Sequence, residues 1–203
     1  MFKSILDKKI TTQAMGKILE ITIATVFILI GIGLRLLSHP PNFAPIAAVA
    51  LFGGVYLSKK IALILPLATM AISDIFIGFY EPKLMVFVYG SFLLCVFLGF
   101  WLKKHKKWYT VMGISILGSI LFFLITNSAV WAFTPWYAKT FSGIVQCYLM
   151  ALPFLKNTFL GDLFYITIFF GVYEIIDAWV RKKFRIVEKI IDTLSINSPR
   201  FRF

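Results

Sequence analysis

The sequence lacks the short motifs with which many enzymes bind phosphates or activate water. It contains no GxxxxGK[ST] phosphate loop, no HExxH zinc motif, no GxSxG nucleophile turn and no glycine-rich dinucleotide signature. We therefore expect no hydrolysis of ATP through a phosphate loop in this chain alone. Catalysis by a grouping of His39, Ser73 and Asp74 is conceivable, but we expect no enzyme and no cofactor.

Cysteine and acidic residues are scarce. Cys95 and Cys147 lack the spacing of metal ligands and fall at different depths, so we expect neither a disulfide framework nor a metal site. Only 9 acidic residues accompany 21 Lys and Arg residues, which gives a net charge of +12. The cations stand at the ends of apolar runs, where they orient helices and contact anionic lipid. A lipid bilayer, and no nucleic acid, is the partner that this charge predicts.

Hydrophobic residues make up 60% of the chain, well above the share in soluble domains, so the chain needs lipid as its solvent. The first apolar run ends at RLLSHPPN without a small-residue cleavage site, so we expect an anchor rather than a signal peptide. Run length and turn residues predict an all-α, polytopic membrane bundle of six transmembrane helices. These spans cover about residues 18–37, 43–58, 61–80, 84–102, 108–131 and 158–179.

Residues 137–155 are ambiguous. A seventh span there would export the basic tail, and Gly143 and Pro153 leave only a short helical stretch, so we expect an outer-face or re-entrant helix. Seventeen Lys and Arg residues then lie on one side of the membrane and four on the other. The positive-inside rule predicts cytoplasmic termini in a bacterial inner membrane. The expected parts are a basic flank (1–17), a six-helix transmembrane domain (18–179) and a basic amphipathic tail (180–203).

Polar residues scattered through the sequence gather near the outer ends of these spans. Asp74 lies about six residues from the end of its span, or ~9 Å deep, and Asp162 lies at a similar level. A carboxylate inside lipid costs ~2.5–3.5 kcal/mol unless it is paired or hydrated, so such residues indicate a functional site by default. They could form an outward-facing pocket for a polar ligand. Alternatively, either acid could cap a helix or pair with Arg35 in a purely structural network.

Aromatic residues at the same level could stack on a heteroaromatic ligand or form an interfacial belt. His39 could be a proton-sensitive gate or an ordinary loop residue, and Cys147 could bind a soft metal centre or act as a small hydrophobe. The candidate ligand-binding residues are Arg35, His39, Asn42, Asp74, Tyr80, Asn127, Trp131, Trp136, Cys147, Tyr148, Asn157 and Asp162.

Small residues recur in the second span, at Ala44, Ala48, Ala50 and Gly54. Small residues let helix backbones approach closely, so they serve either internal packing or the docking of a partner helix.

Four stretches, RLLSHPPNFAPIAAVALFGG, AISDIFIGFY, TNSAVWAF and CYLMALPFLKNTFLGDLFY, resemble a family of small, largely uncharacterised bacterial membrane proteins. That family is similar to the S components of energy-coupling-factor vitamin transporters. The resemblance, over about residues 20–178, implies capture of a vitamin-like micronutrient from outside. It also implies release inward by an energising module. S components typically carry an Ala-xxx-Ala docking motif in their first helix, whereas here the small residues lie in the second span.

We therefore expect a substrate-capturing subunit of an uptake transporter. In that hypothesis Asp74, Asn127 and Asp162 bind polar atoms of the ligand. A non-catalytic membrane scaffold is the second hypothesis, and a small intramembrane enzyme is the third.

Overall fold

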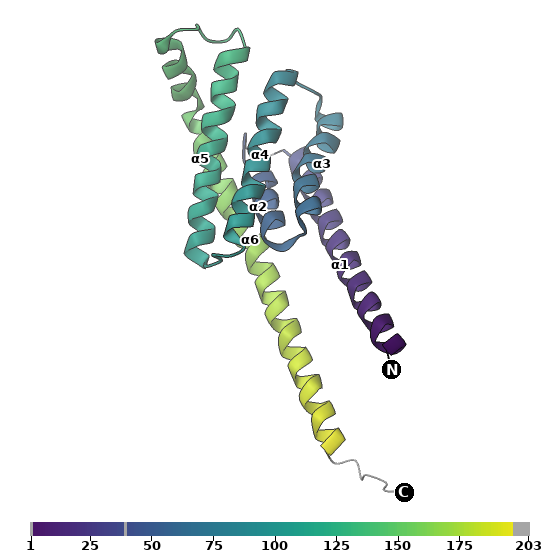
Figure 1. Cartoon of the computed structure of the whole chain (residues 1–203). Helices are drawn as coiled ribbons and strands as arrows, with labels where there is room; N and C mark the ends of the chain where they lie inside the picture. The colour runs from purple at the N-terminus through teal and green to yellow at the C-terminus, as the bar shows by residue number, and fades with distance from the viewer. Residues whose placement is uncertain (1, 39, 197–203) are drawn as a thin grey trace, which may run out of the picture. The chain divides into compact units, whose positions relative to one another are not determined.

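Helices make up the whole regular structure of the described chain (Figure 1). The computed structural model describes residues 2–38 and 40–196, and side-chain surroundings within residues 15–38, 40–180, 182 and 183. The helices are α1 (Phe2–Leu36), α2 (Ile46–Tyr56), α3 (Lys59–Ile77), α4 (Pro82–Leu102), α5 (Trp108–Phe133) and α6 (Phe141–Ile196). The predicted all-α class is confirmed for these residues. The chain divides into two units, Met1–Ile166 and Thr167–Phe203, so α6 contributes to both.

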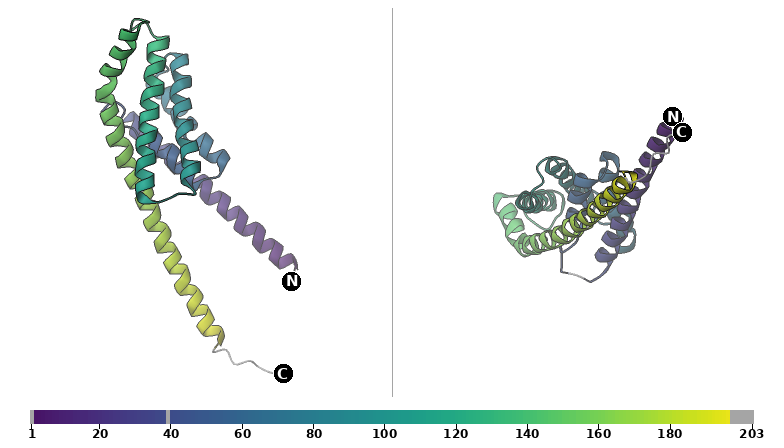
Figure 2. Two further views of the ribbon diagram at one scale, coloured as in Figure 1. Left: turned by 60° about the vertical axis from the view of Figure 1, so that its left-hand side comes forward. Right: turned by 90° about the horizontal axis from the view of Figure 1, so that it is seen from below.

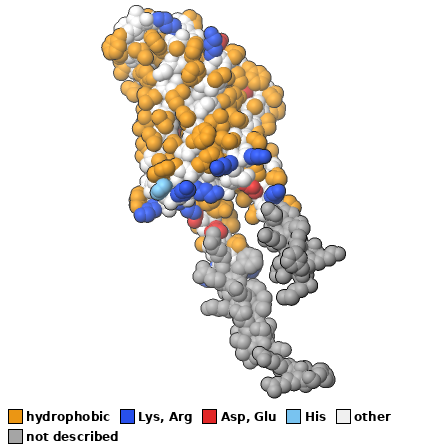
Figure 3. Space-filling model, viewed as in Figure 1, with side chains coloured by type: hydrophobic (Ala, Val, Ile, Leu, Met, Phe, Trp, Pro, Cys, Tyr) orange, Lys and Arg blue, Asp and Glu red, His pale blue; other side chains and the backbone are white. Residues whose placement is uncertain are grey.

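The described helices are those of a membrane-embedded protein. Five stretches are long and apolar enough to cross a bilayer: Met15–Leu36, Lys59–Ile77, Pro82–Leu102, Trp108–Phe133 and Phe141–Val180. Hydrophobic side chains cover most of the described surface visible in Figure 3. Large apolar side chains such as Trp108 and Phe141 are more than three-quarters exposed, which water would penalise and lipid would not.

The predicted short helix at 137–155 is not separate from the last predicted span, because α6 runs through Pro153 without a break. Proline removes one backbone donor, but helices in membrane proteins tolerate this loss where neighbouring groups satisfy the freed carbonyl. Figures 1 and 2 show the first part of α6 running alongside α5. The tail predicted to be amphipathic continues α6 as far as Ile196, and its remaining residues lie outside the described part.

The helix α2 is short and almost wholly buried. Only Ala47 and Tyr56 in it are partly exposed. It packs most closely on α4, where a Cβ atom at Gly54 would lie 2.4 Å from the carbonyl oxygen of Val96 and 2.8 Å from the Cα atom of Gly99. Only glycine allows this approach of two backbones.

Three of the four small residues that were predicted either to pack within the chain or to dock a partner helix are buried inside the bundle. Ala48 and Ala50 are fully buried, Gly54 faces α4, and Ala44 precedes the helix at the edge of a cavity. Ala48, Ala50 and Gly54 thus contribute to packing within the chain, and a docking role for the four residues stays a prediction.

Polar contacts fix the two ends of the first unit. At one end, the α2–α3 turn meets Glu20 of α1 through the backbone N–H of Ser58. Lys106, in the α4–α5 turn, lies at the same end because its ammonium is 3.4 Å from the hydroxyl of Tyr56. At the other end, α1 and α3 are joined by an ion pair between Arg35 and Asp74. The lysines of the two turns therefore gather at the end opposite this pair.

Candidate functional site

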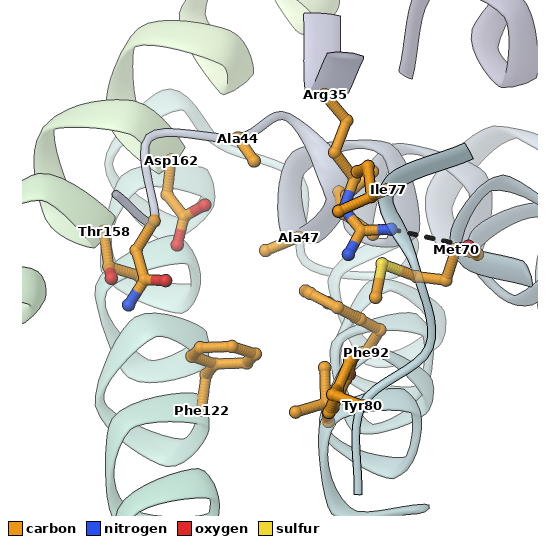
Figure 4. A pocket seen from close by; sticks show the side chains of 13 residues that line it. Arg35, Ala44, Ala47, Met70, Ile77, Tyr80, Phe92, Phe122, Thr158 and Asp162 are labelled. Carbon is orange, nitrogen blue, oxygen red and sulfur yellow. Dashed lines mark hydrogen bonds between the residues drawn. The ribbon is translucent and has the colours of Figure 1, made fainter. Parts of the chain in front are cut away.

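A cavity of about 490 Å³ lies in the first unit, within the size range of small-molecule sites. Every helix of the unit contributes to it, as does the loop between α1 and α2 (Figure 4). Its lining residues are Arg35, Asn42, Ala44, Ile46, Ala47, Met70, Ile77, Tyr80, Val88, Phe92, Phe122, Thr158 and Asp162. The cavity thus combines an apolar lining with a few polar groups, and Arg35 and Asp162 are its charged side chains.

Arg35 reaches the cavity from the last turn of α1 and is held by α3. Its Nη1 atom lies 2.6 Å from Oδ1 of Asp74, donates to the hydroxyl of Ser73 and lies 3.4 Å from the carbonyl oxygen of Met70. Asp74 is fully buried, and its Oδ2 accepts a hydrogen bond of 2.5 Å from the Tyr89 hydroxyl. The predicted alternative in which Arg35 pairs with an acid is thus what the structure contains. Asp74 lies behind Arg35 and does not itself line the cavity.

The guanidinium of Arg35 retains free donors. Its contacts with Asp74, Ser73 and Met70 are all made by Nη1. The Nε and Nη2 atoms form no hydrogen bond with any described residue, although arginine has five N–H donors in total. The side chain is 16% exposed, so these donors can meet a molecule in the cavity.

Asp162 stands on the opposite wall, on α6. Figure 4 shows it beside Thr158, across the open space from Arg35. It is 3% exposed, and its Oδ2 accepts a hydrogen bond of 2.5 Å from the hydroxyl of Ser119 in α5. No Lys or Arg among the described residues forms an ion pair with it. A buried carboxylate without a cation is costly, so Asp162 is the least compensated polar group of the site.

The loop from Pro40 to Pro45 forms part of the cavity wall because α6 holds it in place. The side-chain amide of Asn157 donates to the carbonyl of Pro41 at 3.1 Å. A Cβ atom at Gly161 would lie 3.1 Å from the Cα atom of Phe43, so the loop backbone touches α6 directly. Asn42 adopts a left-handed φ of 64°, a conformation in which asparagine is common, and lines the cavity. Non-helical backbone at such a depth is tolerated where it lines a cavity.

Two phenylalanines supply an aromatic surface between the charged walls. The rings of Phe92 and Phe122 are stacked, with their centroids 5.2 Å apart. Tyr80, in the α3–α4 turn, also lines the cavity, and burial together with the charge of Asp74 raises its pKa to about 12. The Tyr80 hydroxyl is therefore protonated at neutral pH and can donate a hydrogen bond.

Several lining residues were not among the candidates from the sequence: Met70, Phe92, Phe122 and Thr158. An apolar residue in an apolar helix gives no signal of its own, because the same residue facing lipid looks identical. Thr158 carries a weak signal only, since its hydroxyl bonds to the carbonyl of Phe154 in its own helix at 2.8 Å.

Five predicted residues lie instead in the hairpin of α5 and α6, outside the cavity lining: Asn127, Trp131, Trp136, Cys147 and Tyr148. The indole N–H of Trp131 donates to a backbone carbonyl in the α5–α6 turn at 2.9 Å. The Tyr148 hydroxyl shares a hydrogen bond of 2.6 Å with Ser128 and also donates to α5. These contacts brace the hairpin, and a ligand role for the five residues stays a prediction. His39 lies outside the described residues.

The chain belongs to a family of unknown function, DUF6580, whose model matches residues 17–186. Comparison with curated proteins and with solved structures gave no match. Among the described residues, no three His, Cys, Asp or Glu side chains gather as a metal site would require. The family match covers both walls of the cavity, so the site belongs to the part of the chain that defines the family.

Proposed function

We propose that this chain is the substrate-binding subunit of an uptake transporter, similar in role to the S components of vitamin transporters. It captures a small, polar, vitamin-like molecule in the cavity between Arg35 and Asp162. The observation that supports this proposal is a buried carboxylate, Asp162, which faces a cavity of about 490 Å³ without a paired cation among the described residues.

A scaffold would not need this arrangement. The pair of Arg35 and Asp74 does what a structural network requires, because it joins α1 to α3 and satisfies both charges. Asp162 differs, because the hydroxyl of Ser119 is its one hydrogen-bond partner among the described residues. A hydrophobic residue would pack at this position at lower cost in free energy. A ligand that complements Asp162 explains why an acid stands at this position.

The proposed topology gives the cavity access to the outside. The lysines of the α2–α3 and α4–α5 turns lie at the opposite end from Arg35, and the positive-inside rule assigns that lysine-rich end to the cytoplasm. We propose six crossings, in which α2 and the loop before it together make the second. The cavity then opens toward the outer face, with an energising module of the kind that serves S components as the expected partner.

The first experiment identifies what the purified protein carries. The wild type, Asp162→Asn and Glu81→Gln are purified in detergent, and small molecules released from each are identified by mass spectrometry. Glu81 is an exposed acid in the α3–α4 turn and is the matched control, because it does not line the cavity. We expect a stoichiometric compound in the wild type and in Glu81→Gln that is lost in Asp162→Asn.

The scaffold hypothesis makes the opposite prediction. A wild-type protein that releases no compound, and whose melting temperature no member of a micronutrient panel raises, would refute the proposed function. Asp162→Asn would then change stability alone.

A further inference from the structure

We infer that the cavity selects a small organic cation with a hydrogen-bond acceptor at its far end, an inference that rests on the proposed function. It names the class of ligand rather than the existence of one. The two charged walls and the aromatic surface between them, visible in Figure 4, carry the argument.

The charges of the site do not cancel. Arg35 and Asp74 form a close pair, so the positive charge that faces the cavity is already neutralised by the acid behind it. Asp162 has no such partner among the described residues. With Asp162 ionised, the site as a whole carries the charge of one carboxylate, and a ligand that brings one positive charge both complements that carboxylate and favours its ionised form.

An anionic ligand would meet unfavourable surroundings. The carboxylate of Asp162 repels it, and the Arg35 guanidinium offers less attraction than a free one because Asp74 lies 2.6 Å from its Nη1 atom. A cation is favoured for both reasons. The carboxylate of Asp162 attracts it, and Arg35 repels it less than an unpaired guanidinium would because Asp74 offsets the charge of Arg35. Burial strengthens the discrimination, since charges interact more strongly away from water.

The middle of the cavity suits a flat or cationic group. Phe92 and Phe122 present stacked rings to it, and aromatic faces attract both other rings and cations within about 6 Å. A protonated ring nitrogen or an ammonium beside a ring would use these faces and Asp162 together.

The far end of the ligand meets Arg35. Its Nε and Nη2 donors form no hydrogen bond with a described residue, and the protonated hydroxyl of Tyr80 lines the same cavity. Donors of this kind favour a carbonyl, hydroxyl or ring-nitrogen acceptor. The ligand class is therefore a cation at the Asp162 end, an apolar or aromatic middle, and a neutral acceptor at the Arg35 end.

The test ranks ligands by charge. The full chain in lipid nanodiscs is screened by thermal shift against micronutrient-sized compounds grouped as cations, zwitterions, neutral molecules and anions. A matched set of phenols is included: tyramine, tyrosine, para-ethylphenol and para-hydroxyphenylacetate. We expect the compounds that bind to be concentrated among the cations. We also expect Asp162→Asn to weaken the best cation by roughly tenfold to a hundredfold and to leave neutral binders within about twofold.

The outcomes separate this inference from the proposed function. Binding that is strongest for anions, or equal across the groups, would overturn the cation class and leave the binding function standing. No binding in any group would count against both. If Asp162→Asn does not fold, as judged by circular dichroism, the ranking by the wild type decides the question. Glu81→Gln, which removes an exposed acid outside the cavity, then serves as the variant that should keep the preference for cations.

Discussion

Replacement of Gly99 by alanine tests the closest helix contact in the structure. A Cβ atom there would lie 2.6 Å from the carbonyl oxygen of Leu51 and 2.8 Å from the Cα atom of Gly54, and both atoms belong to the α2 backbone. Optimal carbon contacts lie at about 3.5–4.0 Å, so α2 and α4 would have to separate by roughly 1 Å. The neighbouring backbone cannot rotate away as the end of a side chain could.

The size of the effect follows from two opposing contributions. Overpacking of a buried contact costs about 1–3 kcal/mol, whereas alanine is better than glycine in a helix by up to about 1 kcal/mol. Gly90 lies in the same helix and has no atom within 4 Å of an added Cβ, so Gly90→Ala shows the second contribution alone. Both variants gain the helix preference of alanine, so we expect Gly99→Ala to be less stable than Gly90→Ala by the overpacking cost alone, about 1–3 kcal/mol.

The measurement is reversible unfolding of both variants and the wild type in mixed detergent micelles, followed by circular dichroism. Gly90→Ala should match or exceed the wild type, and Gly99→Ala should fall below it. Equal stability of the two variants, or greater stability of Gly99→Ala, would refute the backbone contact between α2 and α4.

Three further predictions use the same unfolding assay. Arg35→Ala should lower stability by about 3–5 kcal/mol because it leaves Asp74 buried without its cation, and adding Asp74→Asn should recover part of that loss; a double variant no better than the single one would contradict the pairing. Ser115→Ala should be neutral or stabilising, since its buried hydroxyl oxygen has no hydrogen-bond partner, whereas Ser119→Ala should cost about 1 kcal/mol; the reverse order would oppose this account of the hydroxyls. Gly78→Ala should cost about 1–2 kcal/mol because φ is 104° there, and an unchanged midpoint would argue against that conformation.

The class of fold was predictable because lipid imposes strong rules on sequence. Long apolar runs and basic turns indicate helices that cross a bilayer, and most of the predicted boundaries fall within a few residues of α3, α4 and α5. The continuity of α6 was not predictable from Pro153, since whether a proline ends a helix depends on the neighbours that satisfy the freed carbonyl.

The candidate site was predictable only where polarity marked it. Arg35, Asn42 and Asp162 are costly in an apolar setting, so their presence indicated a shared pocket, and all three line the cavity. Phe92 and Phe122 carry no such mark, because a phenylalanine facing a cavity and one facing lipid look the same in sequence. Trp131 and Tyr148 were equally polar candidates, but their hydrogen bonds close within the α5–α6 hairpin. Only three-dimensional packing separates these cases.

The shortness of α2 has a consequence for how the protein is made. Its eleven residues rise about 16 Å, roughly half the apolar thickness of a bilayer, so the helix by itself is too short to span the membrane. The surface of α4 on which α2 packs, at Gly99, is synthesised after α2. We therefore expect a waiting step in biogenesis, in which the newly synthesised α2 segment stays at the membrane interface until α4 has been made. Errors in α4 would then appear as misplacement of a segment synthesised well before it.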